Sequence, residues 1–152
     1  NNKYHIPPTL LSRCINFRIN LSNKECLHIS NQLLNNSLES LINKDLIYYY
    51  LTPGNIYHLV NFADQYNYNL LNLDLKNFLK IIIKENYFKK DINIRYMVFH
   101  LIEFYFTKLN LSVSEKINEK YSYFLKKIAD TKSFNLDEES LFIEFEEQVL
   151  NG

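Results

Sequence analysis

Several residue types that mark particular protein classes are scarce in this chain of 152 residues. It contains two Cys, two Gly, three Pro, one Met and no Trp. Two cysteines cannot build a disulfide-stapled scaffold. Two glycines are too few for a backbone loop that cradles a phosphate group, and they disfavour an all-β chain with its tight turns. The shortages point away from disulfide-rich, phosphate-binding and all-β proteins.

Net charge and long apolar runs are also lacking. The chain has 17 basic and 17 acidic residues, so its formal net charge is zero. This balance argues against a protein that coats nucleic acid by bulk electrostatics. No run reaches the roughly 18 apolar residues of a membrane-spanning helix, so we predict no membrane span. With 47% hydrophobic and 15% aromatic residues, the chain can nevertheless build a packed core.

The abundant residue types are biased in one direction. Asn occurs 21 times, Tyr 12 times and Phe 11 times, whereas Ala occurs twice and Arg three times against 14 Lys. Residues with GC-rich codons are the rare ones, which indicates an AT-rich genome. A single Asn, Lys or Tyr therefore carries little weight as a functional signal.

Apolar residues recur with helical rather than alternating spacing almost throughout the chain. The pattern predicts an all-α fold, a compact helical bundle of about seven helices. A short strand over 47–51, which is rich in Tyr and Ile, is the one alternative to helix. No linker divides residues 1–152, so we expect a single helical domain, which could be the C-terminal part of a longer protein. The expected helical segments are 7–18, 22–34, 38–46, 52–67, 71–83, 92–105, 112–128 and 135–149.

Several helix starts can be placed from capping residues. The segments Ser22–Glu25 and Ser112–Glu115 have the capping-box form, in which a hydroxyl and a carboxylate serve each other's backbone amides. Thr52 followed by Pro53 is the clearest start, because Thr can cap and Pro suits the first helical position. The last helix is expected to begin near Asn135, with acidic residues at 137–139 favourably placed at its positive end.

Patterns typical of catalysis and metal binding are missing. Cys26 and His28, with a distant Cys14, are too sparse for a zinc site, and no metalloprotease motif occurs. Dinucleotide-binding and serine-hydrolase motifs are also absent. We therefore predict no enzyme activity, no cofactor and no metal. Whether Cys14 and Cys26 form a disulfide or remain free thiols stays open, and free thiols are favoured.

Charge is unevenly spread despite the neutral total. Residues 76–127 carry a net charge of +6, and residues 130–152 carry −6. One explanation is a basic face with aromatic neighbours that binds RNA or an acidic partner. The other, which we favour, is that the acidic last helix packs against the basic helices and shields them.

Tyrosines and lysines supply the candidate interface. Consecutive helical positions point about 100° apart, so the run 48–50 cannot be buried as a whole in a helix. Tyr is also favoured at interface hot spots. An aromatic excess caused by the AT-rich genome is the alternative explanation. The candidate interface residues are Tyr48, Tyr49, Tyr50, Tyr66, Tyr68, Lys80, Lys84, Lys89 and Lys90.

Residues 42–83 carry a resemblance to a known family. A helix start with Thr52, Pro53 and Gly54 precedes an apolar helix that bears Ala63, and a short turn leads to another helix near Leu71. This pattern resembles the C-terminal helices of the BTB/POZ superfamily, particularly the S-phase kinase-associated adaptor branch and elongin C. The resemblance covers roughly half of the chain. It implies an adaptor that links a scaffold to a recognition subunit, with ubiquitin ligation as one such setting.

The sequence thus predicts a non-catalytic protein–protein interaction module of the adaptor type, with a protein partner. We expect an intracellular location, in the cytoplasm or the nucleus. The alternatives are a helical structural subunit of a larger assembly and a viral helical-bundle inhibitor of host signalling. RNA binding is the alternative from another class, and the zero net charge disfavours it.

Overall fold

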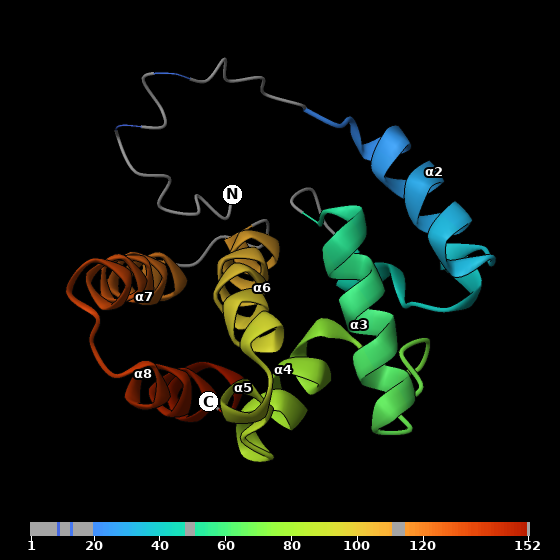
Figure 1. Ribbon diagram of the computed structural model, residues 1–152. Helices are drawn as coiled ribbons and strands as arrows, with labels where there is room; N and C mark the ends of the chain where they lie inside the picture. The colour runs from blue at the N-terminus through green and yellow to red at the C-terminus, as the bar shows by residue number, and fades with distance from the viewer. Residues whose placement is uncertain (1–8, 10–12, 14–19, 48–50, 111–114, 152) are drawn as a thin grey trace.

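The computed structural model describes residues 20–47, 51–110 and 115–151, together with Thr9 and Arg13. These residues are all-α, as predicted, and none of them lies in a strand (Figure 1). The predicted strand at 47–51 centres on residues 48–50, which lie outside the described residues, as does most of the predicted first helix. The described helices are α2 (Asn23–Leu34), α3 (Pro53–Gln65), α4 (Leu75–Lys84), α5 (Tyr87–Lys90), α6 (Ile92–Asn110), α7 (Glu115–Phe134) and α8 (Glu138–Phe145).

Two of the predicted helix starts are confirmed by their hydrogen bonds. Ser22 caps α2, its backbone N–H donates to the Glu25 carboxylate at 2.7 Å, and the Glu25 N–H donates back to the Ser22 hydroxyl at 3.3 Å. Thr52 caps α3 by accepting from the Asn55 N–H at 3.2 Å, with Pro53 in the first helical turn. The capping box predicted at 112–115 lies largely outside the described residues.

Four asparagines of the described chain take the left-handed conformation that other proteins usually assign to glycine. They are Asn35, Asn67, Asn86 and Asn135, with φ between 51° and 57°. Asn tolerates this region better than other residues that carry a Cβ. Each lies at or just beyond the end of a helix, so in this glycine-poor chain asparagine sets the helix boundaries.

Two predicted boundaries need correction. The helix expected from Leu71 begins only at Leu75, because Asp74 caps it by accepting from the Asn77 N–H at 2.7 Å. The last helix begins at Glu138 rather than near Asn135, because Asp137 is its cap. Its first turn is acidic, as predicted.

Residues 38–46 do not form the regular helix that their spacing predicts. They form two 3₁₀ turns, η1 (Leu38–Ser40) and η2 (Lys44–Leu46). Asn43 interrupts the helix, because its backbone N–H donates to the Leu70 carbonyl at 3.0 Å and its side chain accepts from the Asp45 N–H. The apolar residues Leu38, Ile42 and Leu46 are buried all the same.

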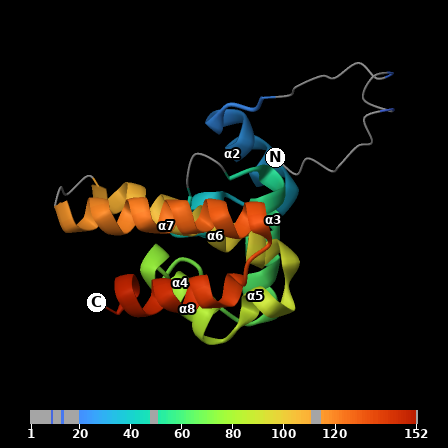
Figure 2. The same ribbon diagram turned by 90° about the vertical axis from the view of Figure 1, so that its left-hand side faces the viewer.

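The helix α6 lies at the centre of the molecule (Figure 1, Figure 2), in contact with α3, α4, α5 and α7. Buried side chains lie on several sides of it, which is typical of a helix surrounded by others. They are Ile94, Met97, Val98, Phe99, Leu101, Ile102 and Phe106. None of the described helices combines the length and the apolar composition that a bilayer crossing needs.

The two C-terminal helices, α7 and α8, run side by side in opposite directions against α6 (Figure 2). Phe145 of α8 contacts the rings of Phe106 on α6 and Phe124 on α7, with centroids 5.7 and 5.5 Å apart. Phe142 contacts Phe88 and Phe99, both at 5.0 Å. These edge-to-face and tilted contacts attach α8 to the rest of the core. Beyond α8 the chain ends in a π-helical turn, η3 (Glu146–Leu150).

The uneven charge of the sequence has a structural explanation. Carboxylates of the last helix pair with cations of the basic region, as the favoured explanation predicted. Glu139 accepts from Lys89 at 2.6 Å, Glu138 lies 3.4 Å from Arg95, and Glu144 pairs with Lys127. The basic face is therefore partly neutralised within the molecule.

Glu144 is expected to contribute a pH-dependent part of the stability. Besides the Lys127 ammonium, it accepts from the Tyr123 hydroxyl at 2.7 Å and the Gln148 amide at 3.0 Å. The bond from Lys127 is the main reason that the pKa of the Glu144 carboxyl lies below its ordinary value of 4.5. A lowered pKa in the folded state stabilises above that ordinary value, and the contribution is lost as the pH falls through the folded-state value.

The substitution Glu144→Gln is therefore expected to cost about 0.5–1 kcal/mol near neutral pH, because the pair is partly solvated. In acid the difference from the wild type should vanish, since the carboxylate is then protonated in both states. Urea unfolding at the two pH values measures this, with Glu147→Gln, a change at an exposed carboxylate of η3, as the control. An equal loss at both pH values would contradict the assignment.

Candidate functional site

The predicted interface tyrosines that the structure describes pack against a common neighbour, Tyr87. Tyr66 and Tyr68 are half-buried, and both rings contact Tyr87 on α5, Tyr66 with a centroid distance of 4.4 Å. The hydroxyls of Tyr68 and Tyr87 lie 3.1 Å apart, and this hydrogen bond raises the pKa of Tyr87. Phe62 of α3 completes the cluster at 5.0 Å from Tyr87. Tyr66 and Tyr68 thus pack α3 against α5, while Tyr48, Tyr49 and Tyr50 lie outside the described residues.

The four predicted interface lysines have different environments. Lys89 is paired with Glu139, and the Lys90 ammonium lies 4.7 Å from the centroid of the Tyr87 ring. Lys84 is exposed and Lys80 half-exposed on α4. The structure therefore brings Tyr66, Tyr68 and Lys90 together around Tyr87, whereas Lys89 is engaged with α8.

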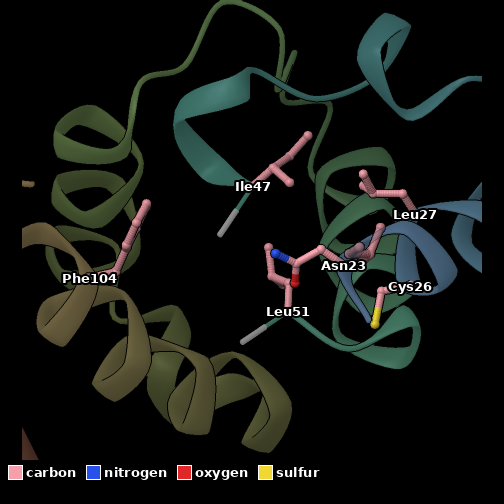
Figure 3. A pocket seen from close by; sticks show the side chains of 7 residues that line it. Asn23, Cys26, Leu27, Ile47, Leu51 and Phe104 are labelled. Atoms are coloured by element: carbon pink, nitrogen blue, oxygen red, sulfur yellow. The ribbon is translucent and has the colours of Figure 1, made fainter. Parts of the chain in front are cut away.

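An open apolar groove lies on another part of the molecule, between α2 and α6. It has a volume of about 300 Å³. Figure 3 shows Phe104 of α6 on one side and Cys26 and Leu27 of α2 on the other, with Ile47 and Leu51 between them. The lining residues of this α2–α6 groove are Asn23, Cys26, Leu27, Ile47, Leu51, Ile56 and Phe104.

The groove exists because α2 is attached along only part of its surface. This helix lies at the edge of the molecule beside α3 (Figure 1). Only one of its 12 residues, Ser30, is buried, whereas the ten-residue helix α4 buries five. Leu27 is 36% exposed and Leu33 53% exposed, so apolar surface extends beyond what α3 covers. Single exposed leucines are common on protein surfaces, so the hollow beside Leu27, rather than the exposure itself, marks the candidate site.

The α6 side of the groove is held by an ion pair. The Lys108 ammonium donates to the Asp45 carboxylate at 2.6 Å and lies 5.6 Å from the centroid of the Phe104 ring. This contact links α6 to η2, directly before the lining residue Ile47. Because the nearby charges satisfy each other, the groove presents mainly carbon surface.

A second cleft, of about 470 Å³, lies where α5 and α6 meet the turn between α7 and α8. Its charged groups are engaged with one another through Lys89–Glu139 and Arg95–Glu138. Asp137 caps α8, and its bond from Ser140 lowers the pKa of the Asp137 carboxyl. This cleft is explained by the packing of α8. Across the described residues, no three His, Cys, Asp or Glu side chains gather closely enough to hold a metal ion.

The sequence prediction missed the residues that form the groove. Leu27 was the one groove residue with a local sequence signal. Together with the other apolar residues of α2 it makes the apolar face of that helix wider than one neighbouring helix can cover. Phe104 lies in the predicted helical segment 92–105, and nothing in the spacing separates it from the core residues of that helix. Ile47 and Leu51 directly flank the predicted interface tyrosines 48–50 in the sequence, so the prediction came within one residue of the groove.

No protein-family model matches the chain, and no curated protein or solved structure matches it. The resemblance to the BTB/POZ superfamily therefore depends on the residues of this sequence alone.

Proposed function

We propose that this protein is a non-catalytic protein-binding module, and that its α2–α6 groove receives apolar side chains from an amphipathic helix of a partner. The observation that carries the proposal is the open apolar cavity of about 300 Å³ beside helix α2, which packs against α3 but buries only one of its residues. An apolar helix face that enters a hydrophobic groove is a recurrent mode of peptide recognition.

The size of the groove suits large side chains. A dry cavity of roughly 150 Å³ accepts one benzene molecule. A groove about twice that size can therefore hold one or two side chains such as Leu or Phe. These are the anchors that helical ligands present at i and i+3 or i+4.

The chemistry of the lining favours a protein partner over a small metabolite. Sites for small molecules place a few polar groups so that they converge on the ligand. Among the lining residues that the structure describes, Asn23 is the only amide and none carries a charge. Affinity would come from burial of apolar surface, as at the centre of a protein interface.

We extend the proposal to an adaptor role, in which the protein joins a scaffold to a recognition subunit. The resemblance to the BTB/POZ helices supports this role. Its helix start is present as the Thr52 cap with Pro53 in the first turn, and its Ala63 is buried in α3. An adaptor needs a second surface, and the aromatic cluster around Tyr66, Tyr68 and Lys90 is the remaining sequence-predicted candidate that the structure brings together.

The proposal is tested by a pair of substitutions on one helix. Leu27→Asp places a charge in the groove, whereas Leu33→Asp makes the same change at a more exposed position that does not line it. Each variant is purified by affinity from the native source beside the wild type, and the co-purifying chains are identified. We expect a protein partner with the wild type and with Leu33→Asp, and its loss with Leu27→Asp. The same partners at the same yield with Leu27→Asp would refute the groove as the binding surface.

A further inference from the structure

Helix α4 carries a row of lysines that the fold leaves unpaired. Lys76 and Lys84 are exposed and Lys80 is half-exposed, at positions i, i+4 and i+8 of this helix. Residues four apart lie on the same side of a helix, so the three side chains form one positively charged strip, the α4 lysine row. In the part of the chain that the structure describes, no carboxylate forms an ion pair with any of them.

Several other cations of the basic region 76–127 are engaged. Lys89, Arg95 and Lys127 pair with carboxylates of α8, and Lys108 pairs with Asp45 at 2.6 Å. The fold thus neutralises the cations that face α8 and η2, whereas the α4 lysine row keeps its positive charge.

The acidic residues at the two ends of α4 do not face the row. Asp74 is the helix cap, and its carboxylate accepts from the Asn77 N–H at 2.7 Å. Glu85 directly follows Lys84, and consecutive helical positions do not face each other. Like charges four residues apart destabilise a helix, and no contact within the described residues relieves this repulsion. A ligand of opposite charge would relieve it.

We propose that the α4 lysine row binds an acidic helix of a protein partner, with carboxylates at i, i+4 and i+8 along one face. Helices share a rise of about 1.5 Å per residue, so both charge rows repeat about every 6 Å and match when the helices lie side by side. Lys–Glu pairs between adjacent helices set partner choice and orientation. The inference goes beyond the proposed function, because none of the described residues that line the α2–α6 groove belongs to α4.

The aromatic side chains around the row favour a protein partner over RNA. Proteins that bind single-stranded RNA offer free aromatic faces on which bases stack. The aromatic residues of α4 and of the adjacent α5 are Phe78, Tyr87 and Phe88, and all three are buried. The Tyr87 ring is further covered by Tyr66, at a centroid distance of 4.4 Å, and by the Lys90 ammonium at 4.7 Å. The row therefore presents charge without a surface for base stacking.

The test is a titration of the isotope-labelled full chain with three ligands, followed by NMR. The first ligand is an alanine-rich helical peptide with glutamates at i, i+4 and i+8. The second is a peptide of the same composition whose glutamates lie on different faces of the helix. The third is an oligouridylate of about 12 nucleotides. The titration is done at about 0.1 M salt, where the Debye length is about 10 Å and distant charges are screened.

Two variants of equal net charge accompany the wild type. The row variant combines Lys76→Glu, Lys80→Glu and Lys84→Glu. The control makes the same change at three exposed lysines of other elements, Lys24→Glu, Lys44→Glu and Lys126→Glu. Circular dichroism and urea unfolding verify that both variants keep the fold.

We expect the first peptide to bind the wild type at least about fivefold more tightly than the second, because only the first can form all three exposed pairs together. Its affinity should fall at least about tenfold in the row variant and stay within about twofold in the control. Equal affinities of the two peptides for the wild type would overturn the proposal, and this comparison does not depend on any variant. Equal losses in the row variant and the control would also overturn it. So would an oligouridylate that binds more tightly than the first peptide and is lost in the row variant.

Discussion

Replacing Phe145 with Ala is expected to lower the free energy of unfolding by about 3–5 kcal/mol. Phe145 is fully buried, and its ring contacts Tyr105, Phe106 and Phe124 at centroid distances of 5.5–5.9 Å. The substitution removes the anchor of α8 and leaves a cavity among rings on α6 and α7 that cannot easily collapse. Urea denaturation followed by circular dichroism measures the change.

The matched control for this prediction lies two residues away. Ile143 is on the same helix but 42% exposed, so Ile143→Ala should cost less than about 1 kcal/mol. Similar losses at the two positions would mean that α8 does not pack as described. Such a result would also contradict the position of α8, from which its ion pairs with the basic region follow.

Replacing Leu46 with Ala is expected to cost about 2–5 kcal/mol, the range for a buried aliphatic side chain cut back to Ala. Leu46 lies in η2 and is fully buried together with Leu38 and Ile42. These residues belong to the same cluster of buried side chains as those of α6 and α8. If residues 38–46 fold cooperatively with the remainder, the single unfolding transition moves as a whole.

Leu71→Ala is the control. Like Leu46, Leu71 lies outside the α-helices, in the connection between α3 and α4, but its side chain is 41% exposed. It should change the stability by less than about 1 kcal/mol. Two separate transitions in the Leu46→Ala variant would show that residues 38–46 form an independent unit, against the prediction of a single domain for residues 1–152. One shifted transition would support that prediction.

The helical class was predictable because it depends on local periodicity and capping chemistry. Ser22 and Thr52 act as caps in the structure as their sequence contexts indicated. The helix starts at Leu75 and Glu138 were harder to predict, because their caps, Asp74 and Asp137, lie inside the predicted segments 71–83 and 135–149. Helix ends were also harder to predict, because they depend on asparagines in the left-handed conformation. In a chain with 21 Asn, nothing in the composition distinguishes the four that take this conformation from the remainder.

The break at Asn43 could not be predicted from the local sequence. It results from a hydrogen bond to the Leu70 carbonyl, a partner 27 positions away along the chain. The apolar spacing of Leu38, Ile42 and Leu46 fits a helix and two 3₁₀ turns equally well, because either arrangement can bury all three. Only the tertiary contact decides between them.

The α2–α6 groove was not predicted, for a similar reason. Residue preference selected tyrosines and lysines, and the structure uses Tyr66, Tyr68 and Lys89 for contacts within the molecule. The groove instead joins Leu27 to Phe104, which lie far apart in the sequence. Single-sequence patterns register which positions are apolar, but they do not register which apolar positions the fold brings together around one groove.

The most direct test of the central claim is a calorimetric titration of the purified partner into the wild type, Leu27→Asp and Leu33→Asp. Loss of a central anchor at an interface costs about 2 kcal/mol or more, which is roughly a thirtyfold loss of affinity. The account predicts a loss of at least that size for Leu27→Asp and less than about a threefold change for Leu33→Asp, whose side chain lies outside the groove. Equal dissociation constants for the wild type and Leu27→Asp would contradict it.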